Sequence, residues 1–314
     1  MRSRKLFRNW LSAGVKYYLV KSGLLHDDNI EVVCRDGSKS LITVRAYAVL
    51  AYDYYDGYLM KYDCKNGIAT YMNVQVPIEE IIRVRNAMGT AVAVGWAYDM
   101  VNRFWFKNGI KFRHMYYTIF EIFIHGEYDS LDVKDKVVID VGAFVGDSAI
   151  YFALKGAKRV IAVEPHPGAF AEMLENIKLN KMENIIIPVN AGLASKSGKV
   201  CLEKSFDNSE TLVIYHGLGD CINAISAVTL GELISRFGVD PDNAVLKMDC
   251  EGCEYDVILN DYEHIRMFKE LVFEYHPYIV NKPLDDLLNM LNRDFRCVVI
   301  KGDKNLGIAH CIRK

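Results

Sequence analysis

The clearest pattern in the sequence is a pair of short apolar runs separated by a glycine-containing turn and a helix-like segment. Residues 137–139 form a β-branched run that ends at Asp140, which is typical of a strand buried on both faces. Residues 159–163 form a second strand-like run, which is apolar from Val160 onward and ends at Glu164. Because the apolar segment 148–155 lies between the two runs, the pattern predicts a strand, a turn, a helix and a second strand in succession.

The turn after the first run carries the chemistry that this unit offers. It contains Gly142 and Gly146, and Glu164 follows the second run. Glycines allow a ligand to approach the backbone closely, and the start of a helix offers unpaired N–H groups. A carboxylate at the tip of the second strand suits the two hydroxyls of a ribose. We therefore expect a nucleoside-bearing cofactor across the strand ends; the alternative is an ordinary β-α-β unit without a ligand.

Strands and helices continue to alternate toward the C-terminus. Thr229 and Glu232 form a capping box, which predicts a helix start. The expected helices begin near Pro165, Leu230, Tyr255 and Leu284, and the expected strands are 185–187, 244–248, 271–273, 297–300 and 307–312. This order predicts an α/β fold with a mostly parallel sheet, helices on both faces and an antiparallel pair at the C-terminal edge. An insertion at 195–228 is expected to hold a hairpin of 200–202 and 212–214.

The first part of the chain has the pattern of a smaller α+β domain. Asn66-Gly67 and Asn108-Gly109 are strong signals for hairpin turns. The expected strands are 30–34, 41–51, 58–64 and 68–74, a further hairpin lies in 104–112, and the expected helices are 78–88 and 117–124. We place an accessory or substrate domain at residues 1–120 and the main domain at residues 121–314.

Composition and charge limit the classes of partner and the cellular compartment that we expect. The formal net charge is −2, from 38 basic and 40 acidic side chains among 314 residues, which argues against a nucleic-acid partner. The eight cysteines and the absence of an evident signal peptide favour reduced thiols in the cytoplasm, where a buried cysteine acts as a small hydrophobe. Cys250 and Cys253 form a lone C-x-x-C pair, so no zinc site is expected.

The N-terminal segment 1–25 has a basic amphipathic composition. It contains six Lys or Arg residues and no acidic residue, with apolar and aromatic side chains interspersed. Such a segment can lie weakly on an anionic membrane surface, but a solvated helix that packs on its own domain is the favoured interpretation. The sequence contains no run of about 20 uncharged apolar residues, so no membrane-spanning helix is expected.

The turn at 140–147 reads D-V-G-A-F-V-G-D, with Phe144 where a dinucleotide site has its second glycine, and this argues against a pyrophosphate on the loop. The turn resembles the first motif of S-adenosylmethionine (SAM)-dependent methyltransferases, and more narrowly the FkbM-like family. The resemblance continues through AVEPHPGAF (162–170), ENIKLN (175–180), TLGELI (229–234), LKMDCEGCEYDVI (246–258) and VFEYHP (272–277). It covers roughly residues 121–300, and Phe144 departs from the asparagine that is usual in the family.

The resemblance implies a Rossmann-like sheet and SAM-dependent O-methylation, with S-adenosyl-L-homocysteine (SAH) as the product. The expected acceptor is a hydroxyl on a sugar, glycan, lipid headgroup or small metabolite. Ligands of open α/β sheets bind beyond the carboxyl ends of the strands. On that rim the expected cofactor contacts are Asp140, Gly142, Ala143, Gly146, Asp147, Ser148, Glu164, Asn190 and Ala191. In the family the segment before the first strand lies near the cofactor, so Glu127 and Tyr128 are further contacts.

The expected catalytic residues are His276, Asp249 and Glu251, at the tips of the next two strands. Imidazole titrates near neutral pH, so His276 fits a base that takes the acceptor's proton. Asp249 and Glu251 would orient it or hold the acceptor, and Lys247 would pair with these acids. Mg²⁺ bound by Asp249, Glu251 and Glu254 is an alternative that we do not favour, so no metal site is predicted.

Two other functions stay open at the level of sequence. An RNA methyltransferase would fit the basic N-terminal segment, but the chain lacks the N-P-P-[YF] motif of amino-group methylases and is slightly acidic. A non-catalytic glycan- or membrane-binding module could retain the same nucleoside fold.

Overall fold

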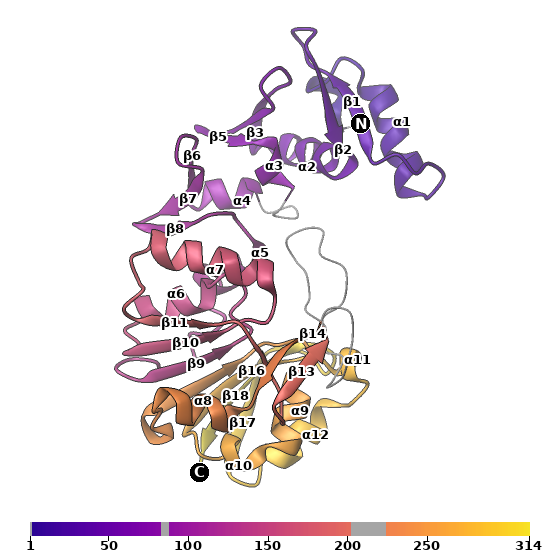
Figure 1. Cartoon of the computed structure of the whole chain (residues 1–314). Coiled ribbons are helices and arrows are strands. Elements are labelled where there is room, and N and C mark those ends of the chain that lie inside the picture. Colours follow the sequence, from indigo (N-terminus) through magenta and orange to yellow (C-terminus); the bar gives the residue numbers. More distant parts are fainter. Residues whose placement is uncertain (1, 83–87, 202–223) are drawn as a thin grey trace. The chain divides into compact units, whose positions relative to one another are not determined.

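The computed structural model describes residues 2–82, 88–201 and 224–314 (Figure 1). The chain divides into two compact units; the first ends at Phe120 and the second begins at Glu121. We describe each unit by itself.

The second unit is built on a seven-stranded sheet with the strand order β11-β10-β9-β15-β16-β18-β17. Its strands are β9 (Val137–Val141), β10 (Arg159–Val163), β11 (Ile186–Val189), β15 (Ala244–Met248), β16 (Glu270–Tyr275), β17 (Phe295–Gly302) and β18 (Gly307–Arg313). β18 runs antiparallel to both of its neighbours, and the other pairings are parallel. This is the predicted Rossmann-like sheet, and the expected antiparallel pair lies at its C-terminal edge.

Helices cover both faces of this sheet: α6 and α7 lie on one face, and α8, α9, α10 and α12 lie on the other (Figure 1). The helices of the unit are α6 (Asp147–Leu154), α7 (Pro167–Leu179), α8 (Leu230–Phe237), η2 (Pro241–Asn243), α9 (Cys253–Asn260), α10 (Tyr262–Ile265), α11 (Pro277–Val280) and α12 (Leu284–Leu291), and α5 (Tyr117–Phe123) crosses the division between the units. The capping box of Thr229 and Glu232 opens α8 as predicted.

The parallel strands are buried because both of their faces pack against helices, and such strands favour apolar, often β-branched residues. All residues of β15 are buried, and the core includes Ile139, Leu246 and Phe273. In the register of β9 and β15, Asp140 lies opposite Lys247. Since β9, β10, β15 and β16 are parallel, their carboxyl ends share one edge of the sheet, and this edge carries the site.

A small three-stranded sheet follows β11. It has the order β12-β14-β13 and consists of β12 (Gly192–Leu193), β13 (Gly198–Cys201) and β14 (Ala224–Val228). β13 pairs with β14 in antiparallel register. The predicted hairpin partner of β13, residues 212–214, lies outside the described residues.

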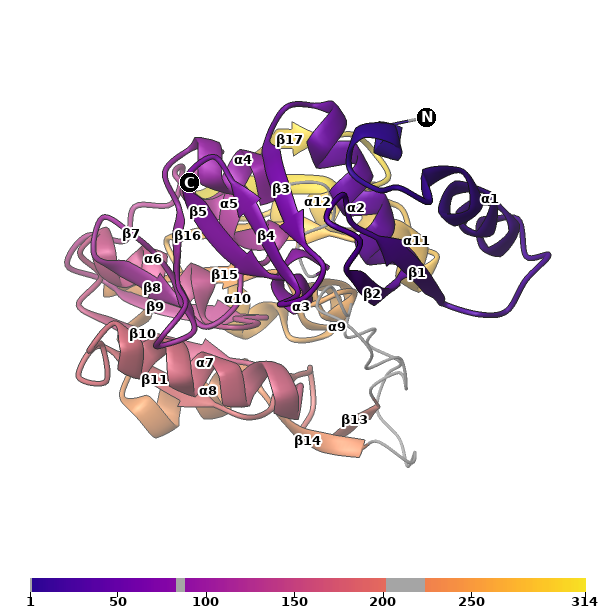
Figure 2. The same cartoon turned by 90° about the horizontal axis from the view of Figure 1, so that it is seen from above.

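The first unit holds short strands and helices. These are η1 (Arg2–Lys5), α1 (Trp10–Lys21), β1 (Asn29–Val33), β2 (Lys39–Thr43), α2 (Val44–Tyr55), β3 (Leu59–Asp63), β4 (Ile68–Tyr71), β5 (Val74–Pro77), α3 (Ile78–Ile81), α4 (Met88–Ala93), β6 (Ala97–Asp99), β7 (Phe104–Lys107) and β8 (Ile110–Phe112). Its sheets are the β1-β2 pair and the three-stranded sheets β3-β4-β5 and β6-β7-β8. α1 lies beside β1 in both views (Figure 1 and Figure 2).

The predicted strand 41–51 is wrong over most of its length. Only its first residues belong to β2, and α2 begins at Val44. Thr43 caps this helix, because its hydroxyl accepts a hydrogen bond from the Ala46 N–H at 3.1 Å. The apolar residues Ala46, Val49 and Leu50 of α2 are buried together, so helical packing outweighs their strand-like composition.

Two other predictions for this unit need correction. The predicted strand 68–74 is two strands, β4 and β5, with a turn at Met72, whose φ of 50° is left-handed. The predicted helix 78–88 is present only at its two ends within the described residues. α3 forms its start, and α4 begins at Met88. Residues 83–87, between them, lie outside the described residues.

The expectation of reduced cysteines is wrong, because none of the described cysteines is free. Disulfides join Cys34 to Cys64, Cys250 to Cys253 and Cys297 to Cys311. Pairing depends on how far apart the Cα atoms lie, and residues 34 and 64 come within 5.9 Å only after the chain folds. Disulfides are typical of oxidising compartments and of intracellular proteins of hyperthermophiles, so the cytoplasmic prediction loses the support of these thiols.

The N-terminal helix α1 packs by one side and leaves apolar side chains on the other. Ala13 and Gly14 are buried, whereas Leu11, Val15 and Tyr18 are exposed. A membrane contact by this segment stays a prediction. In the part of the chain that the structure describes, no helix combines the length and apolarity needed to cross a bilayer.

Candidate active site

The glycine turn after β9 is shaped by contact with a second turn, the one that follows β15. Gly142 has a φ of +73°, and a Cβ on it would lie 1.7 Å from the Asp249 carbonyl oxygen. Gly146 has a φ of +83°, and a Cβ there would lie 2.9 Å from Met173 Cγ of α7. Gly142 is therefore required by the approach of another strand end as well as by its backbone conformation.

We expect Gly142→Ala to destabilise the protein by about 3 kcal/mol or more, because it combines a left-handed residue with a backbone clash. The matched control is Gly238→Ala at the end of α8, where φ is +56° and no atom lies within 4 Å of the added Cβ. Urea unfolding of the two variants measures the difference. Equal losses of stability would contradict the clash.

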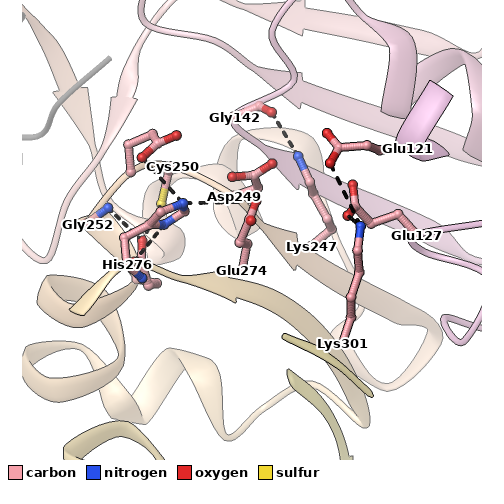
Figure 3. A network of polar contacts seen from close by, with 12 residues as sticks. Glu121, Glu127, Gly142, Lys247, Asp249, Cys250, Gly252, Glu274, His276 and Lys301 are labelled. Carbon is pink, nitrogen blue, oxygen red and sulfur yellow. Dashed lines mark hydrogen bonds and ion pairs between the residues drawn. The ribbon is translucent and has the colours of Figure 1, made fainter. Parts of the chain in front are cut away.

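Asp140 lies beneath the glycine turn rather than on the rim. Its side chain is fully buried; its Oδ2 accepts a hydrogen bond from Ser148 Oγ at 2.7 Å, and its Oδ1 lies 3.0 Å from Lys247 Nζ. Lys247 also donates to the Gly142 carbonyl at 2.8 Å (Figure 3). Burial disfavours the charged lysine, but Asp140 and then Asp249 outweigh it and raise the pKa of Lys247. Asp140 thus supports the turn from below. Lys247 forms its salt bridge with Asp140, and the predicted partner Asp249 acts on Lys247 through its charge.

Glu164 at the tip of β10 faces the glycine turn. Its Oε2 accepts the Phe144 N–H at 2.8 Å, and its Oε1 accepts the His166 N–H at 2.7 Å. The side chain is buried, and this burial raises its pKa to about 8. Each carboxylate oxygen has room for a second donor, so two ribose hydroxyls suit this buried acid.

The remaining residues of the predicted cofactor half surround the same tips. Ala143 is buried in the turn, and Asp147 and Ser148 are buried at the start of α6. Asn190 follows β11 and donates from Nδ2 to the Glu164 carbonyl at 2.9 Å, with the buried Ala191 next to it. The structure therefore brings the predicted set, with the exception of Asp140, to one region of the rim.

The acceptor half begins at Asp249, directly after β15. The Tyr128 hydroxyl donates to its Oδ2 at 3.1 Å, and burial with the carboxylate of Asp249 raises the pKa of Tyr128 well above its usual value. Tyr128 therefore stays a donor. Glu274 at the end of β16 lies beside Asp249 (Figure 3), and burial together with the charge of Asp249 raises the pKa of Glu274 well above its usual value. Glu274 is thus expected to hold a proton at neutral pH.

His276 lies close to these acids, with 2% of its surface exposed. Its Nε2 lies 3.3 Å from Glu251 Oε2, and its Nδ1 lies 3.3 Å from Glu254 Oε1. Burial lowers the pKa of His276, but Glu254 and Glu251 outweigh it and raise the pKa to about 9. Burial also favours a proton on Glu251, so His276 and Glu251 compete for one proton. We place this proton on His276, because the carboxylate of Glu254 faces the second ring nitrogen and stabilises the charged imidazolium. This geometry favours an imidazolium, which differs from the neutral base expected from the sequence.

One group of described side chains has the spacing of a metal site. Ligand atoms of Asp249, Glu274 and His276 lie within 4.8 Å of one another. Both nitrogens of His276 face carboxylates, however, and an imidazolium has no lone pair for a metal. We therefore assign no metal to these residues, and the absence of a metal stays a prediction.

Sequence reasoning missed a salt bridge near the rim. Lys301 at the end of β17 lies 2.6 Å from Glu127 Oε1 and 3.8 Å from Glu121 Oε1 (Figure 3). Lys301 and Glu127 are 174 positions apart in the sequence, so no local sequence pattern links them. In the sequence, only the family resemblance connects Glu127 and Tyr128 to the site.

The second unit is similar in sequence to known methyltransferases. The family described as the Methyltransferase FkbM domain matches residues 140–297. An uncharacterized protein, 158B of Sulfolobus islandicus rod-shaped virus 1, is 30% identical over 164 residues, which are 52% of this chain and 74% of that protein. The hexuronic acid methyltransferase AglP of Haloferax volcanii is 29% identical over 178 residues, 56% of this chain and 71% of that protein.

Two further matches are more limited. The tRNA (guanine(37)-N(1))-methyltransferase Trm5b of Methanocaldococcus jannaschii is 45% identical over 55 residues, 18% of this chain and 16% of that protein. A crystal structure of a Methyltransferase FkbM from Methylobacillus flagellatus KT is 16% identical, with a TM-score of 0.43. That match covers 59% of this chain and 45% of the solved one, so this chain spans less than half of its length.

Proposed function

The chain belongs to the FkbM methyltransferase family, and from this we propose that it methylates a sugar hydroxyl with SAM as the methyl donor. The observation that carries the proposal is the arrangement of the rim. The glycine turn and Glu164 form one half, and Asp249, Glu251 and Glu274 lie in the next turn along the same edge. A methyl-transfer reaction needs a binding site for the cofactor next to a binding site for the acceptor, because the two reactants must be held side by side.

The cofactor half suits an adenosine group. Glu164 would accept hydrogen bonds from the ribose hydroxyls, and Asn190 and Ala191 at the end of β11 would lie against the base. Bound SAM would supply a sulfonium methyl group, which has a good leaving group of its own. The protein's contribution is therefore to align the acceptor and to accept its proton.

Asp249 is the residue that we assign to the acceptor's proton. It is partly exposed, whereas His276 is buried and has a carboxylate facing each ring nitrogen. Its backbone also contacts the end of β9, because its N–H donates to the Val141 carbonyl at 3.0 Å. As the acceptor oxygen forms its bond to the methyl carbon, the hydroxyl proton would pass to the Asp249 carboxylate, and the carbon–sulfur bond electrons would remain on sulfur. His276 then acts as a positioning residue for Glu251.

The acceptor class follows from charge and from the relatives. Carboxylates dominate this half of the rim, which favours an uncharged hydroxyl over an anionic group at the reacting position. The hexuronic acid methyltransferase relative supports a sugar acceptor. The tRNA methyltransferase match spans only 55 residues, and a net charge of −2 does not favour a nucleic-acid acceptor.

Two measurements test this function in sequence. Calorimetry with SAM and with SAH measures binding to the folded protein, and no binding at millimolar concentration would contradict the proposal. Turnover of methyl-labelled SAM then compares a neutral glycoside, a hexuronoside and tRNA. We expect label in the glycosides; transfer to tRNA alone would exclude the sugar, and SAM binding without transfer in a cell extract would favour a non-catalytic module.

We expect His276→Gln to lower turnover by about tenfold while SAH affinity is retained, because Glu251 loses its partner but Asp249 keeps its position. The exposed His26→Gln in the first unit is the control. If His276 itself accepts the proton, the loss of turnover in His276→Gln should be that expected for a catalytic base, about 100-fold or more. Steady-state kinetics and calorimetry on the same preparations separate these outcomes.

A further inference from the structure

The turn between β15 and α9 carries Glu251 in an unusual backbone conformation. Glu251 has a φ of 54° and Gly252 has a φ of 107°, so two consecutive residues lie in the left-handed region. For a residue with a side chain this conformation costs about 1–2 kcal/mol. Something in the turn must therefore hold Glu251 in place.

The two ends of this turn are anchored to the rest of the site. Asp249 donates from its N–H to Val141 at 3.0 Å, which joins the turn to β9. At the other end, Glu254 accepts the Gly252 N–H at 2.9 Å and the His276 N–H at 3.0 Å. Glu251 lies between these anchors with its Oε2 3.3 Å from His276 Nε2. The position of the Glu251 carboxylate thus depends on how tightly the turn is closed.

Two connections close the turn across its open side. One is a backbone hydrogen bond from the Cys253 N–H to the Cys250 carbonyl, and it is long, at 3.4 Å. The other is the Cys250–Cys253 disulfide, which holds the two Cα atoms 5.4 Å apart. A covalent link therefore provides most of the closure, and it brackets Glu251 and Gly252.

We propose that the Cys250–Cys253 disulfide is a redox-dependent positioning element that holds Glu251 against His276, so that its reduction slows the reaction. This inference rests on the proposed methyltransferase function. It assigns to the C-x-x-C pair a role in the acceptor half of the site and none in cofactor binding.

The two sulfurs differ in access. Cys250 is partly exposed, whereas Cys253 is buried at the first position of α9. A thiolate of a dithiol reductant would attack Cys250 Sγ; the sulfur–sulfur bond would break, and its electrons would pass to Cys253 Sγ, where the helix N-terminus stabilises a thiolate. The second thiol of the reductant then displaces Cys250, which yields two protein thiols and a cyclic oxidised reductant.

The experiment compares oxidised protein with protein treated with dithiothreitol, after mass spectrometry of unreduced peptides has mapped the 250–253 link. We expect reduction to lower kcat by about tenfold, with the KM for SAM and the affinity for SAH changed less than about twofold. Reoxidation should restore kcat. The double variant Cys250→Ser/Cys253→Ser should have the lower kcat from the start and should not respond to the reductant.

The control is Cys34→Ser/Cys64→Ser in the first unit, in which the response to the reductant should persist. Full turnover with alkylated, reduced Cys250 and Cys253 would overturn the inference, and so would a response that survives in the 250/253 variant. A readout without turnover is hydrogen exchange of the peptide that contains residues 249–253, which should quicken on reduction; unchanged exchange would also overturn the inference. Failure of SAH to bind the oxidised protein would instead contradict the proposed function.

Discussion

Replacing Asp249 by asparagine is expected to lower turnover by about 100-fold or more while SAH binds as before. The amide keeps the shape of the side chain and can still accept the hydrogen bond from Tyr128, which is 3.1 Å long in the parent protein. It cannot take a proton from the acceptor, and general-base catalysis contributes about 10²–10⁴-fold. Initial rates with saturating SAM and calorimetry with SAH measure the two effects separately.

The control for this change is Asp285→Asn, an exposed acid in the first turn of α12. Its turnover should equal that of the parent protein. A kcat of Asp249→Asn within a factor of about three would remove Asp249 as the base. If His276→Gln then proved the more damaging change, the imidazole would regain the role that the sequence suggested.

Replacing Glu164 by alanine is expected to weaken SAH binding by more than about tenfold, because charged hydrogen bonds to the ribose hydroxyls are lost. The exposed Glu183→Ala, in the turn after α7, is the control. Since the carboxylate also accepts the Phe144 and His166 N–H groups, the thermal unfolding of the variant must be compared with that of the parent. Unchanged affinity in a folded variant would refute the ribose contact.

The pH dependence gives a second test of Glu164. In the cofactor-free protein its pKa is raised to about 8, so the carboxyl holds a proton at neutral pH, whereas the ribose hydroxyls favour the ionised form. Binding of SAH near neutral pH should therefore release a proton, and affinity should rise as the pH approaches about 8. Calorimetry in buffers of different ionisation enthalpy measures this proton, which should disappear in Glu164→Ala.

The same shift has a consequence for stability. The folded protein retains the Glu164 proton up to about pH 8, whereas the unfolded chain loses it near 4.5. The contribution of this group to stability is therefore complete below about pH 4.5 and is lost as the pH rises through about 8.

The central unit of the fold could be predicted from sequence because its signals are local. The strands β9 and β10 are buried β-branched runs, and glycines bound the helix between them. The strand tips then placed Glu164 and Asp249 on one rim by topology alone. The 41–51 segment failed because its apolar residues suit a strand or a helix equally, and the Thr43 cap decides between them.

The parts of the site that sequence did not predict depend on contacts between distant residues. Lys247 and Asp140 meet only because β15 and β9 pair in one register. Tyr128 and Asp249 are 121 positions apart. The protonation of His276 likewise depends on two carboxylates that come close to it only in the folded chain. A histidine in a peptide has a pKa near neutral, so the sequence alone does not predict the raised pKa.

The position of β18 limits how the chain can be shortened. It lies inside the sheet, paired with β16 on one side and with β17 on the other, although it is formed by residues 307–313. Deleting the chain from Gly307 onward would detach β17, with Lys301 at its tip, and leave the inner edge of β16 open to association with other strands. Expression designs that remove residues 307–313 would thus remove an interior element of the sheet.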